Sequence, residues 1–298
     1  MARLFAPTGP ALSAPGGRPI RASLTPRDVR QLLLEHGLSP RRSAGQNFVV
    51  DPNTVRRIVR EAGIGPEDRV LEIGPGLGSL TLPLAERAAH VLAIEIDAGL
   101  VAALRTVLAG RSNVEVVHAD ALRTNLDDAL GGHPARLVAN LPYHVATPLV
   151  FHALASSSVT DAFVMVQREV GERWAAVPGD RRYAGVSLKL ALQADVEVAL
   201  VISRRVFHPV PNVDSVMVRL TRRDDAPDSA TYRRLAALSD TAFAQRRKTL
   251  RNTLAGVASS DVLAAAATEA GVDLGWRAER LDADQLRRLD AALQARVR

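Results

Sequence analysis

Short apolar segments alternate with helical segments between residues 69 and 167, and this alternation restricts the possible folds more than any other feature of the chain. The apolar segments are residues 69–74, 90–96, 114–119, 136–140 and 162–167, and helical spacing is clearest in residues 79–88 and 98–109. A helix that joins two neighbouring strands makes them parallel, and such crossovers are right-handed. The sequence therefore predicts an α/β fold built on a parallel sheet.

Two later apolar segments predict an antiparallel hairpin at one end of this sheet. Residues 196–203 and 214–220 have the alternation and the β-branched content of strands. The loop between them contains Phe207, Pro209 and Pro211 and leaves no room for a crossover helix. With these two segments the sheet has about seven strands.

The composition changes after Arg222, where we expect one domain to end. Residues 224–229 have the character of a linker, and the chain beyond them is rich in Ala, Leu and Arg with helical spacing. We predict a disordered extension at residues 1–23, an α/β domain at residues 24–223 and a small helical domain at residues 224–298.

Positive charge is concentrated near the two ends of the chain. The 298 residues carry a formal net charge of +6, and residues 1–46 hold seven arginines against two acidic residues. Residues 221–252 hold eight lysines and arginines against four aspartates. Such segments favour a polyanionic partner without identifying it. The rest of the chain carries about three excess negative charges, which leaves the centre available for a different ligand.

The composition also disfavours several classes of function. The chain has no cysteine, which excludes disulfides, thiol catalysis and cysteine-based zinc sites, and which fits a reducing, cytoplasmic environment. No apolar run approaches the ~18 residues of a membrane span, so we expect no membrane association. His144 and His208 stand apart from acidic residues and other histidines, so we predict no metal site.

A glycine-rich turn follows the first strand of the α/β pattern. Gly74, Gly76 and Gly78 precede a helical segment, where glycine lets the backbone approach a ligand and the helix N-terminus offers unpaired N–H groups. Their spacing differs from the G-x-G-x-x-G pattern that binds the pyrophosphate of a dinucleotide. A glycine turn alone is weak evidence for a ligand.

Two acidic residues stand at the ends of the next two strands. Glu95 ends the second strand, where its carboxylate can accept hydrogen bonds from ribose hydroxyls. Asp120 ends the third strand, where it can accept from an adenine amino group. Taken singly, each is readily explained as a solvated strand-end residue. Both carboxylates repel phosphate, so together with the glycine turn they predict a nucleoside with a zwitterionic tail, and S-adenosyl-L-methionine fits that description.

Asn140, Leu141, Pro142 and Tyr143 follow the fourth strand and predict the site of reaction. An exocyclic amine on an aromatic ring is a poor nucleophile until its lone pair is turned toward the methyl group of a sulfonium. The side-chain oxygen of Asn140 and the backbone carbonyl of Leu141 or Pro142 can accept the two N–H groups of such an amine. Pro142 stiffens the turn, and Tyr143 supplies a ring that can stack on an extruded base. The alternative interpretation is a polar turn after a buried strand.

A second aromatic residue would complete a clamp around the base. Phe207 lies in a proline-stiffened loop and is our candidate, and Phe48 competes for the same role. The alternative for Phe207 is an edge residue that packs under its own loop.

Seven segments together resemble the ribosomal RNA adenine N6-methyltransferases, in particular the small-subunit dimethyltransferases, over residues 27–296. They are GQNFVVD (45–51), LEIGPGLGSLT (71–81), AIEID (93–97), HAD (118–120), NLPYHVATPLVFH (140–152), FHPVPNVDSVMVRL (207–220) and FAQRRKTLRNTL (243–254). The NLPY motif with the GPGLG turn is typical of the superfamily, and the last two segments point to the small-subunit branch.

The resemblance implies a Rossmann-like class I methyltransferase sheet with a small helical C-terminal domain. It implies that the protein dimethylates two adjacent adenines in a hairpin loop near the 3′ end of 16S rRNA, in the small ribosomal subunit or its assembly intermediate. We expect a monomer. The cofactor contacts of the family map onto Asn47, Val49, Gly74, Glu95, Asp120 and Asn140. The family usually has Leu where Val49 stands and commonly has Asn where His144 stands.

The C-terminal basic segment is a candidate RNA-binding surface. Arg246, Arg247, Lys248 and Arg251 have a spacing that would put two or three of them on one helix face. There they could follow an RNA backbone, with binding that weakens as salt rises. The alternative is a solvated helix face.

Three other functions remain open from the sequence. An Erm-type large-subunit rRNA methyltransferase, which gives antibiotic resistance, shares the fold and the Asn-x-Pro-aromatic motif, although the C-terminal segments argue against it. A binding checkpoint in ribosome assembly would use the same surface as the enzyme. A DNA adenine methyltransferase is disfavoured because no target-recognition domain is visible.

Overall fold

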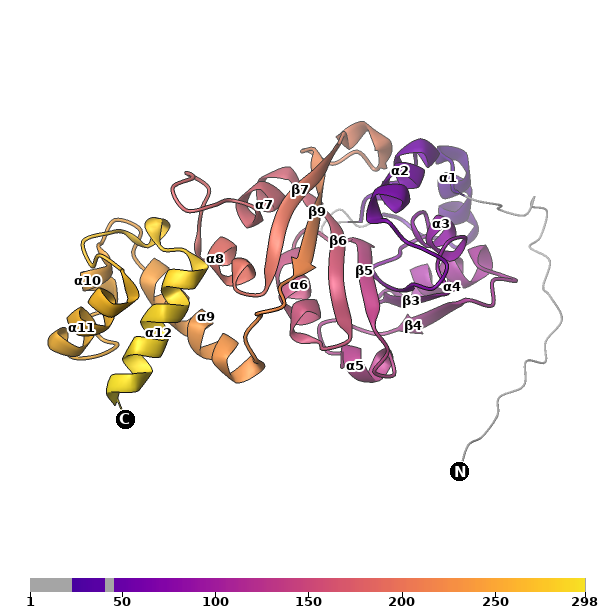
Figure 1. Cartoon of the computed structure of the whole chain (residues 1–298). Helices are drawn as coiled ribbons and strands as arrows, with labels where there is room; N and C mark the ends of the chain where they lie inside the picture. The colour runs from indigo at the N-terminus through magenta and orange to yellow at the C-terminus, as the bar shows by residue number, and fades with distance from the viewer. Residues whose placement is uncertain (1–22, 41–45, 298) are drawn as a thin grey trace, which may run out of the picture. The chain divides into compact units, whose positions relative to one another are not determined.

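The computed structural model describes residues 23–40 and 46–297 (Figure 1). Within these residues the main sheet has seven strands in the order β4-β3-β2-β5-β6-β9-β7, and β1 and β8 form a separate two-stranded sheet. The predicted α/β class, with about seven strands and an antiparallel final hairpin, is confirmed. The predicted extension at residues 1–23 lies almost wholly outside the described residues.

The chain divides into two compact units. The first comprises the described residues up to His144 together with Arg204–Asn212, and the second comprises Val145–Ser203 and the chain from Val213 onward. The domain limits proposed from the sequence, with a boundary near residue 224, remain a proposal.

The first unit is built on parallel strands. Its elements are α1 (Pro26–Glu35), β1 (Phe48–Val49), α2 (Pro52–Ala62), β2 (Arg69–Ile73), α3 (Thr81–Ala85), β3 (His90–Glu95), α4 (Ala98–Val107), β4 (Val114–His118), α5 (Leu126–Ala129), β5 (Ala135–Asn140), a 3-10 turn (Arg204–Val206) and β8 (Phe207–His208). Strand β2 pairs in parallel with β3 and with β5, and β3 pairs in parallel with β4. Because parallel strands end at the same edge of a sheet, Gly74, Glu95, Asp120 and Asn140 emerge at one edge.

The helix after the glycine turn is shorter than the predicted segment 79–88. At its start, Ser79 and Leu80 continue the turn that Gly78 makes with φ 89°, and the helix begins only at Thr81. At its end, the Arg87 N–H donates to the Leu84 carbonyl in a tighter turn that closes the helix. The glycine turn therefore takes up more of the chain than the sequence pattern indicated.

The second unit contains the antiparallel strands and the C-terminal helices. Its elements are α6 (Ala146–Ala155), β6 (Val159–Gln167), α7 (Arg168–Trp174), α8 (Gly185–Ala191), β7 (Ala194–Ile202), β9 (Ser215–Arg222), α9 (Ser229–Phe243), α10 (Leu250–Thr253), α11 (Ser260–Ala270), a 3-10 turn (Ala278–Arg280) and α12 (Ala283–Val297). Strand β9 pairs antiparallel with both β6 and β7, and Ser215 lies opposite Gln167 on one side and Ile202 on the other. The predicted hairpin of β7 and β9 is thus observed.

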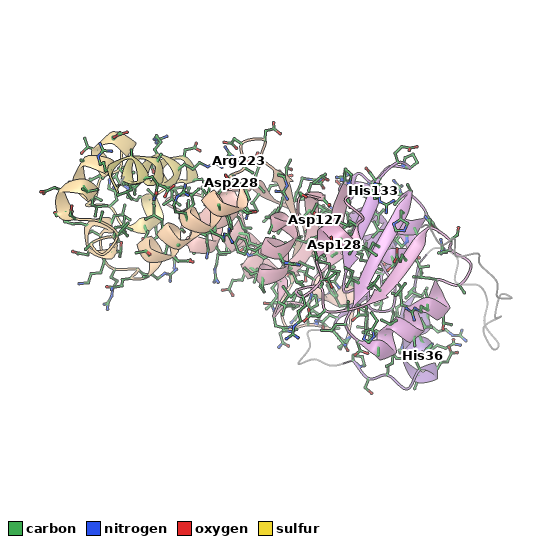
Figure 2. All side chains as sticks on the ribbon, turned by 90° about the horizontal axis from the view of Figure 1, so that it is seen from below. His36, Asp127, Asp128, His133, Arg223 and Asp228 are labelled. Carbon is green, nitrogen blue, oxygen red and sulfur yellow. The ribbon has the colours of Figure 1, made fainter. Side chains whose placement is uncertain are left out.

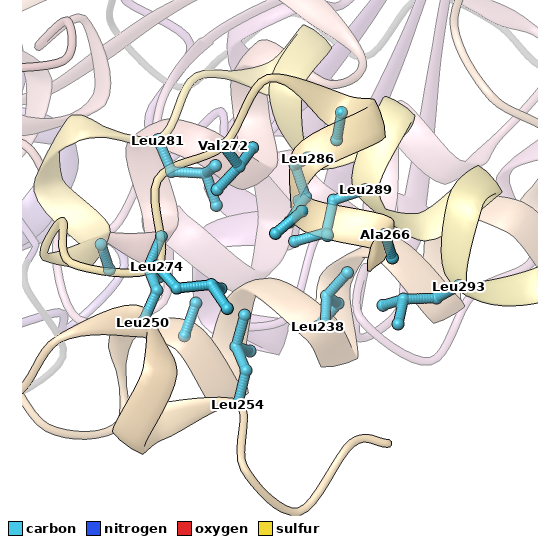
Figure 3. Packing of buried hydrophobic residues seen from close by; sticks show 14 of the residues in the cluster. Leu238, Leu250, Leu254, Ala266, Val272, Leu274, Leu281, Leu286, Leu289 and Leu293 are labelled. Atoms are coloured by element: carbon cyan, nitrogen blue, oxygen red, sulfur yellow. The ribbon is translucent and has the colours of Figure 1, made fainter. Parts of the chain in front are cut away.

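Helices α9 to α12 share one hydrophobic core with α8 and the loop before it (Figure 3). Leu250, Leu254 and Leu286 are fully buried in it. The buried Tyr183 hydroxyl donates to the Leu281 carbonyl at 2.8 Å, which ties the loop before α8 to the segment before α12. This core supports the predicted helical composition of the C-terminal region.

Charged side chains fix the start of α9 where the sequence predicted a linker. Asp228 caps the helix by accepting hydrogen bonds from the Ala230 and Thr231 N–H groups. Arg223 binds Asp225 at 2.8 Å, and its guanidinium holds the pKa of the Asp225 carboxyl at about 2. Figure 2 labels Arg223 and Asp228 beside this helix. The segment before α9 is therefore fixed by specific contacts.

Residues 23–40 and 46–297 offer neither a membrane-spanning helix nor a cluster of metal ligands. None of the helices there has both the length and the apolar character needed to cross a bilayer. The same residues contain no group of three or more side chains suited to hold a metal ion.

The helical core gives a first prediction. Leu254→Ala removes a fully buried side chain at the end of α10 and should lower the free energy of unfolding by about 2–5 kcal/mol, through reduced burial and the cavity left behind. Urea denaturation measures this change. Val257→Ala, at an exposed position three residues on, is the matched control and should change stability by less than about 0.5 kcal/mol. Equal losses in the two variants would contradict this description of the core.

Candidate functional site

Three glycines in the left-handed region shape the turn after β2. Gly74, Gly76 and Gly78 have φ angles of 70°, 57° and 89°. A Cβ atom on Gly76 would lie 2.9 Å from Cε1 of Phe48, so the turn can approach that ring only as glycine. A Cβ atom on Gly74 would lie 3.4 Å from Cδ of Pro142, which places the turn beside the predicted reaction site.

The Glu95 carboxylate is held against the glycine turn. Its Oε2 accepts from the Gly76 N–H at 3.1 Å, and its Oε1 accepts from the Asp97 N–H at 3.0 Å. The residue is 5% exposed, and burial raises the pKa of the carboxyl while backbone hydrogen bonds from Asp97, Gly76 and Ile96 oppose that rise. Each carboxylate oxygen can accept more than one hydrogen bond, so both can still receive a ligand hydroxyl.

Asp120 lies at the neighbouring strand end, two residues beyond β4. The Ala119 N–H donates to the Glu95 carbonyl at 3.0 Å, which joins the two strand ends. The Asp120 Oδ1 accepts from the Leu122 N–H at 2.9 Å, and its Oδ2 lies 3.7 Å from Nε of Arg123. The side chain is partly exposed, so it remains accessible to a ligand at the same sheet edge as Glu95.

The Asn140 side chain has a fixed orientation. Its Nδ2 donates to the backbone carbonyl of Asn47 at 3.0 Å. Since a carbonyl can only accept, the amide nitrogen must face Asn47 and Oδ1 must face the other way. Among the described residues this is the one hydrogen bond of the Asn140 side chain, so its Oδ1 keeps its capacity to accept from a ligand.

Solvent exposure rises along the rest of the NLPY segment and the residue after it. Leu141 is buried, Pro142 and Tyr143 are partly buried, and His144 is exposed. The Leu141 side chain therefore anchors the segment, and the residues after it face the surface. Tyr143 is therefore partly accessible at the surface.

The two-stranded sheet of β1 and β8 brings together predicted residues that are far apart in sequence. Val49 lies opposite Phe207, and the Val50 N–H donates to the Val206 carbonyl at 2.8 Å. Phe207 is 2% exposed and Phe48 is also buried. Neither ring offers a face to solvent, which is what the packing alternative for Phe207 expects. Its place in a base clamp stays a prediction.

The predicted helix face of basic residues is wrong. Helix α9 ends at Phe243, so Arg246, Arg247 and Lys248 lie in a turn and only Arg251 lies in α10. The physical reason is a tertiary contact: α10 is fixed by its backbone N–H groups, which donate to the carbonyls of residues 274 and 276. All four basic residues are exposed, and within the described chain their side chains make no ion pair or hydrogen bond.

Glu72 is a feature that the sequence interpretation passed over. It lies on β2, two residues before Gly74, is 1% exposed, and its Oε2 has no hydrogen-bond partner among the described residues. Burial, with a smaller contribution from the neighbouring Glu95 charge, raises the pKa of this carboxyl to about 8. An acidic residue inside the apolar segment VLEI was the available signal. The site therefore contains a second buried carboxyl next to its ribose-binding candidate.

Comparison with known proteins identifies the family. The model of the ribosomal RNA adenine dimethylase family matches residues 37–294, which is most of the chain. The chain belongs to the ribosomal RNA adenine dimethylase family. Curated members named ribosomal RNA small subunit methyltransferase A include one from Thermobifida fusca, 52% identical over 87% of this chain and 92% of the relative. Another, from Streptomyces avermitilis, is 47% identical over 90% of this chain and 93% of the relative.

Two solved methyltransferase structures have the same fold. The 23S rRNA methyltransferase ErmE has a TM-score of 0.66 at 30% identity, with 83% of this chain and 99% of that chain covered. A dimethyladenosine transferase from Plasmodium falciparum also has a TM-score of 0.66, at 26% identity, with 80% of this chain and 94% of that chain covered. The predicted resemblance and the predicted methyltransferase class are confirmed.

The polar groups at the sheet edge fit the methyl donor that such an enzyme needs. Glu95 and Asp120 offer carboxylate oxygens, and the turn from Gly74 to Gly78 contains no basic side chain that would select a phosphate. Asn47 and Asn140, which are joined by a hydrogen bond, lie at the same end of the sheet. The site thus suits a nucleoside without phosphate.

Glu72 gives a pH prediction. Its folded-state pKa of about 8 lies above the ~4.3 of an unfolded chain, so the unfolded state releases this proton first as pH rises. The stability from Glu72 is complete below about pH 4 and is lost between about pH 4 and pH 8. Glu72→Gln cannot ionise at this position. Between about pH 5 and pH 9, the free energy of unfolding should therefore fall by a few kcal/mol more in wild type than in the variant.

Urea denaturation at about pH 5, 7 and 9 measures the difference in stability between wild type and Glu72→Gln. Over this range the folded and unfolded states bind the Glu72 proton differently. Glu67→Gln, at an exposed position, is the control and should follow wild type across the whole range. If wild type and Glu72→Gln keep a constant difference in stability across that range, Glu72 is already ionised at the lowest pH and the assignment fails.

Proposed function

We propose that this protein dimethylates the N6 amino groups of two adjacent adenines in a hairpin loop near the 3′ end of 16S rRNA, with S-adenosyl-L-methionine as methyl donor. Its substrate is the small ribosomal subunit or an assembly intermediate of it, and it acts as a cytoplasmic monomer. The names of the Thermobifida and Streptomyces relatives support the choice of subunit. The chemistry is supported by the arrangement around Asn140.

The orientation of Asn140 carries the proposal. With Nδ2 committed to the Asn47 carbonyl at 3.0 Å, Oδ1 is the acceptor that remains for the target amine. The backbone carbonyl of Leu141 or Pro142 accepts the second N–H. Two fixed acceptors hold the amine so that its lone pair faces the methyl donor, and they stabilise the positive charge that develops on nitrogen. The methylated ammonium is acidic enough to lose its proton to water, so no strong base is needed.

The residues at the sheet edge hold the methyl donor. Glu95 accepts from ribose hydroxyls, Asp120 accepts from the adenine amino group, and the turn at Gly74 lets the backbone approach the amino-acid tail. Asn47 and Val49 line the site from β1 and the residue before it. S-adenosyl-L-methionine supplies the methyl group as part of a sulfonium.

Aromatic rings hold the extruded base. Tyr143 is partly exposed and stacks on the purine, at a gain of about 1–3 kcal/mol for one base. Phe207 is proposed as the second ring, and because it is 2% exposed this role requires the β8 loop to open when the base enters. The same loop contains the 3-10 turn of Arg204 and Arg205.

The turn between α9 and α10 binds the RNA backbone. Arg246, Arg247, Lys248 and Arg251 are exposed and make no ion pair within the described chain, so their charges can be used on phosphates without breaking an internal contact. A turn can present its side chains over a wider surface than one helix face. Binding by such a cluster should weaken as salt rises, because each phosphate contact releases counterions.

Asn140→Ala tests the proposed chemistry. It removes the acceptor and should lower the methylation rate at saturating methyl donor by about 100-fold or more, the usual cost of losing one fixed hydrogen-bonding group at a reacting centre. Asn140→Asp keeps an acceptor but loses the donor to Asn47, so it should retain more activity than Asn140→Ala. Incorporation of labelled methyl groups into unmethylated small subunits measures both.

The control is His144→Ala, an exposed residue four positions on that should keep wild-type activity. Asn140→Ala and Glu95→Ala should still bind immature small subunits, because neither residue is in the basic cluster. If Asn140→Ala methylates at the wild-type rate, the proposed holding of the amine is wrong. If both variants lose binding as well as methylation, the separation of binding from chemistry is wrong.

The basic turn gives a separate prediction on RNA affinity. Replacing Arg246, Arg247 and Lys248 by Gln should weaken binding to small subunits at low salt. It should also make log K less steep against log salt by about 0.7–0.9 for each phosphate that these side chains no longer neutralise. Binding assays over a series of salt concentrations measure the slope.

A charge-matched control is available in α7 and the loop after it. Arg168, Arg173 and Arg182 are exposed but already bind Glu172, Glu169 and Asp180, so their replacement by Gln should leave the slope unchanged. An unchanged slope in the first variant would remove the proposed RNA-binding role of the turn.

A further inference from the structure

The residue His118 belongs to the HAD segment, yet neither the proposed cofactor contacts nor the proposed reaction uses it. It is the last residue of β4 and is exposed, and it lies opposite Glu95 in the parallel register. Its Nε2 lies 3.1 Å from the backbone carbonyl of Ile96. A carbonyl cannot donate, so the ring must donate through Nε2–H.

Beyond this bond, the segment Glu95–Asp97 is held mainly at its two ends. At its far end Asp97 caps α4, where its Oδ1 accepts from the Gly99 and Leu100 N–H groups and its carbonyl accepts from the Val101 N–H. Ile96 is 64% exposed, so packing does not fix this residue. The Glu95 carbonyl accepts from the Ala119 N–H at 3.0 Å, and the Asp97 N–H donates to the Glu95 carboxylate at 3.0 Å. The peptide between Ile96 and Asp97 therefore carries two hydrogen bonds, one to the His118 ring through its carbonyl and one to Glu95 through its N–H.

We infer that His118 is a positioning residue for the methyl donor: by holding the Ile96 carbonyl it fixes the peptide whose N–H orients the Glu95 carboxylate. This inference rests on the proposed function, because it takes Glu95 as the ribose contact. Without the ring, the Ile96 carbonyl loses its partner and the peptide can tilt between its two fixed ends, so the Asp97 N–H holds Oε1 less firmly. Ordering the carboxylate then adds to the free-energy cost of binding the ligand.

Loss of the His118 ring should weaken ligand binding and leave the rate of the chemical step unchanged. His118→Ala should raise the dissociation constant for S-adenosylmethionine about three- to tenfold, the usual range for one hydrogen bond. The rate at saturating methyl donor should stay within about twofold of wild type, since His118 touches no reacting atom. His118→Gln, which also offers an N–H donor, should recover most of the affinity.

A double-mutant cycle tests whether His118 acts through Glu95. In a Glu95→Gln background, His118→Ala should cause no further loss of affinity, because the carboxylate that it orients is absent. Titration calorimetry with S-adenosylmethionine measures all four proteins. His133→Ala, at an exposed histidine of the same unit that Figure 2 labels, is the control and should bind like wild type.

Hydrogen exchange at the Asp97 amide gives a ligand-free readout, and His118→Ala should make it faster than in wild type. Wild-type affinity in His118→Ala, an equal loss in the Glu95→Gln background, or unchanged exchange at Asp97 would each overturn the inference. Failure of the wild-type protein to bind S-adenosylmethionine would instead overturn the proposed function, and the exchange measurement would still decide the role of His118.

Discussion

The hydrogen bond from Asn140 to the Asn47 carbonyl is the interaction on which the account of this site depends. It joins the end of β5 to the segment before β1, and it assigns the two ends of the carboxamide without ambiguity. A carboxamide that could rotate would also present its donor end, and a donor would repel the N–H groups of the target amine. The turn beside it is also constrained, because Gly74 has φ 70°, a backbone conformation that favours glycine, and it lies next to Pro142.

The sheet edge shows how much of the site the sequence could predict. The sequence places Gly74, Glu95, Asp120 and Asn140 each at the end of a strand. Because parallel strands end on the same side, the registers of β2, β3, β4 and β5 bring them to one edge. Glu72 could have been recognised as an ionisable residue in an apolar strand. The hydrogen bond between His118 and Ile96 could not, since it depends on the register of two strands that brings together residues 22 positions apart.

Tertiary contacts explain where the sequence reasoning failed. The segment 243–254 has helical spacing, yet α9 stops at Phe243 and a separate helix begins at Leu250, where the Leu250 and Arg251 N–H groups bond to carbonyls of residues 276 and 274. The glycine turn is longer than predicted because it continues through Ser79 and Leu80 before α3 begins at Thr81. The pairing of β1 with β8, two residues each, is too short to be visible in a pattern of alternation. For the basic turn and for the short sheet, the deciding partner is far away in the sequence.

The central claim is that fixed acceptors at the end of β5 hold an adenine amino group of small-subunit rRNA for methylation. The most direct test incubates unmethylated small and large ribosomal subunits separately with the protein and S-adenosylmethionine, and maps the modified nucleotides by mass spectrometry. We predict two neighbouring N6,N6-dimethyladenosines in the 3′-terminal hairpin of 16S rRNA and an unmodified large subunit. Dimethylation of 23S rRNA alone, or methyl groups on another atom of the base, would contradict the account.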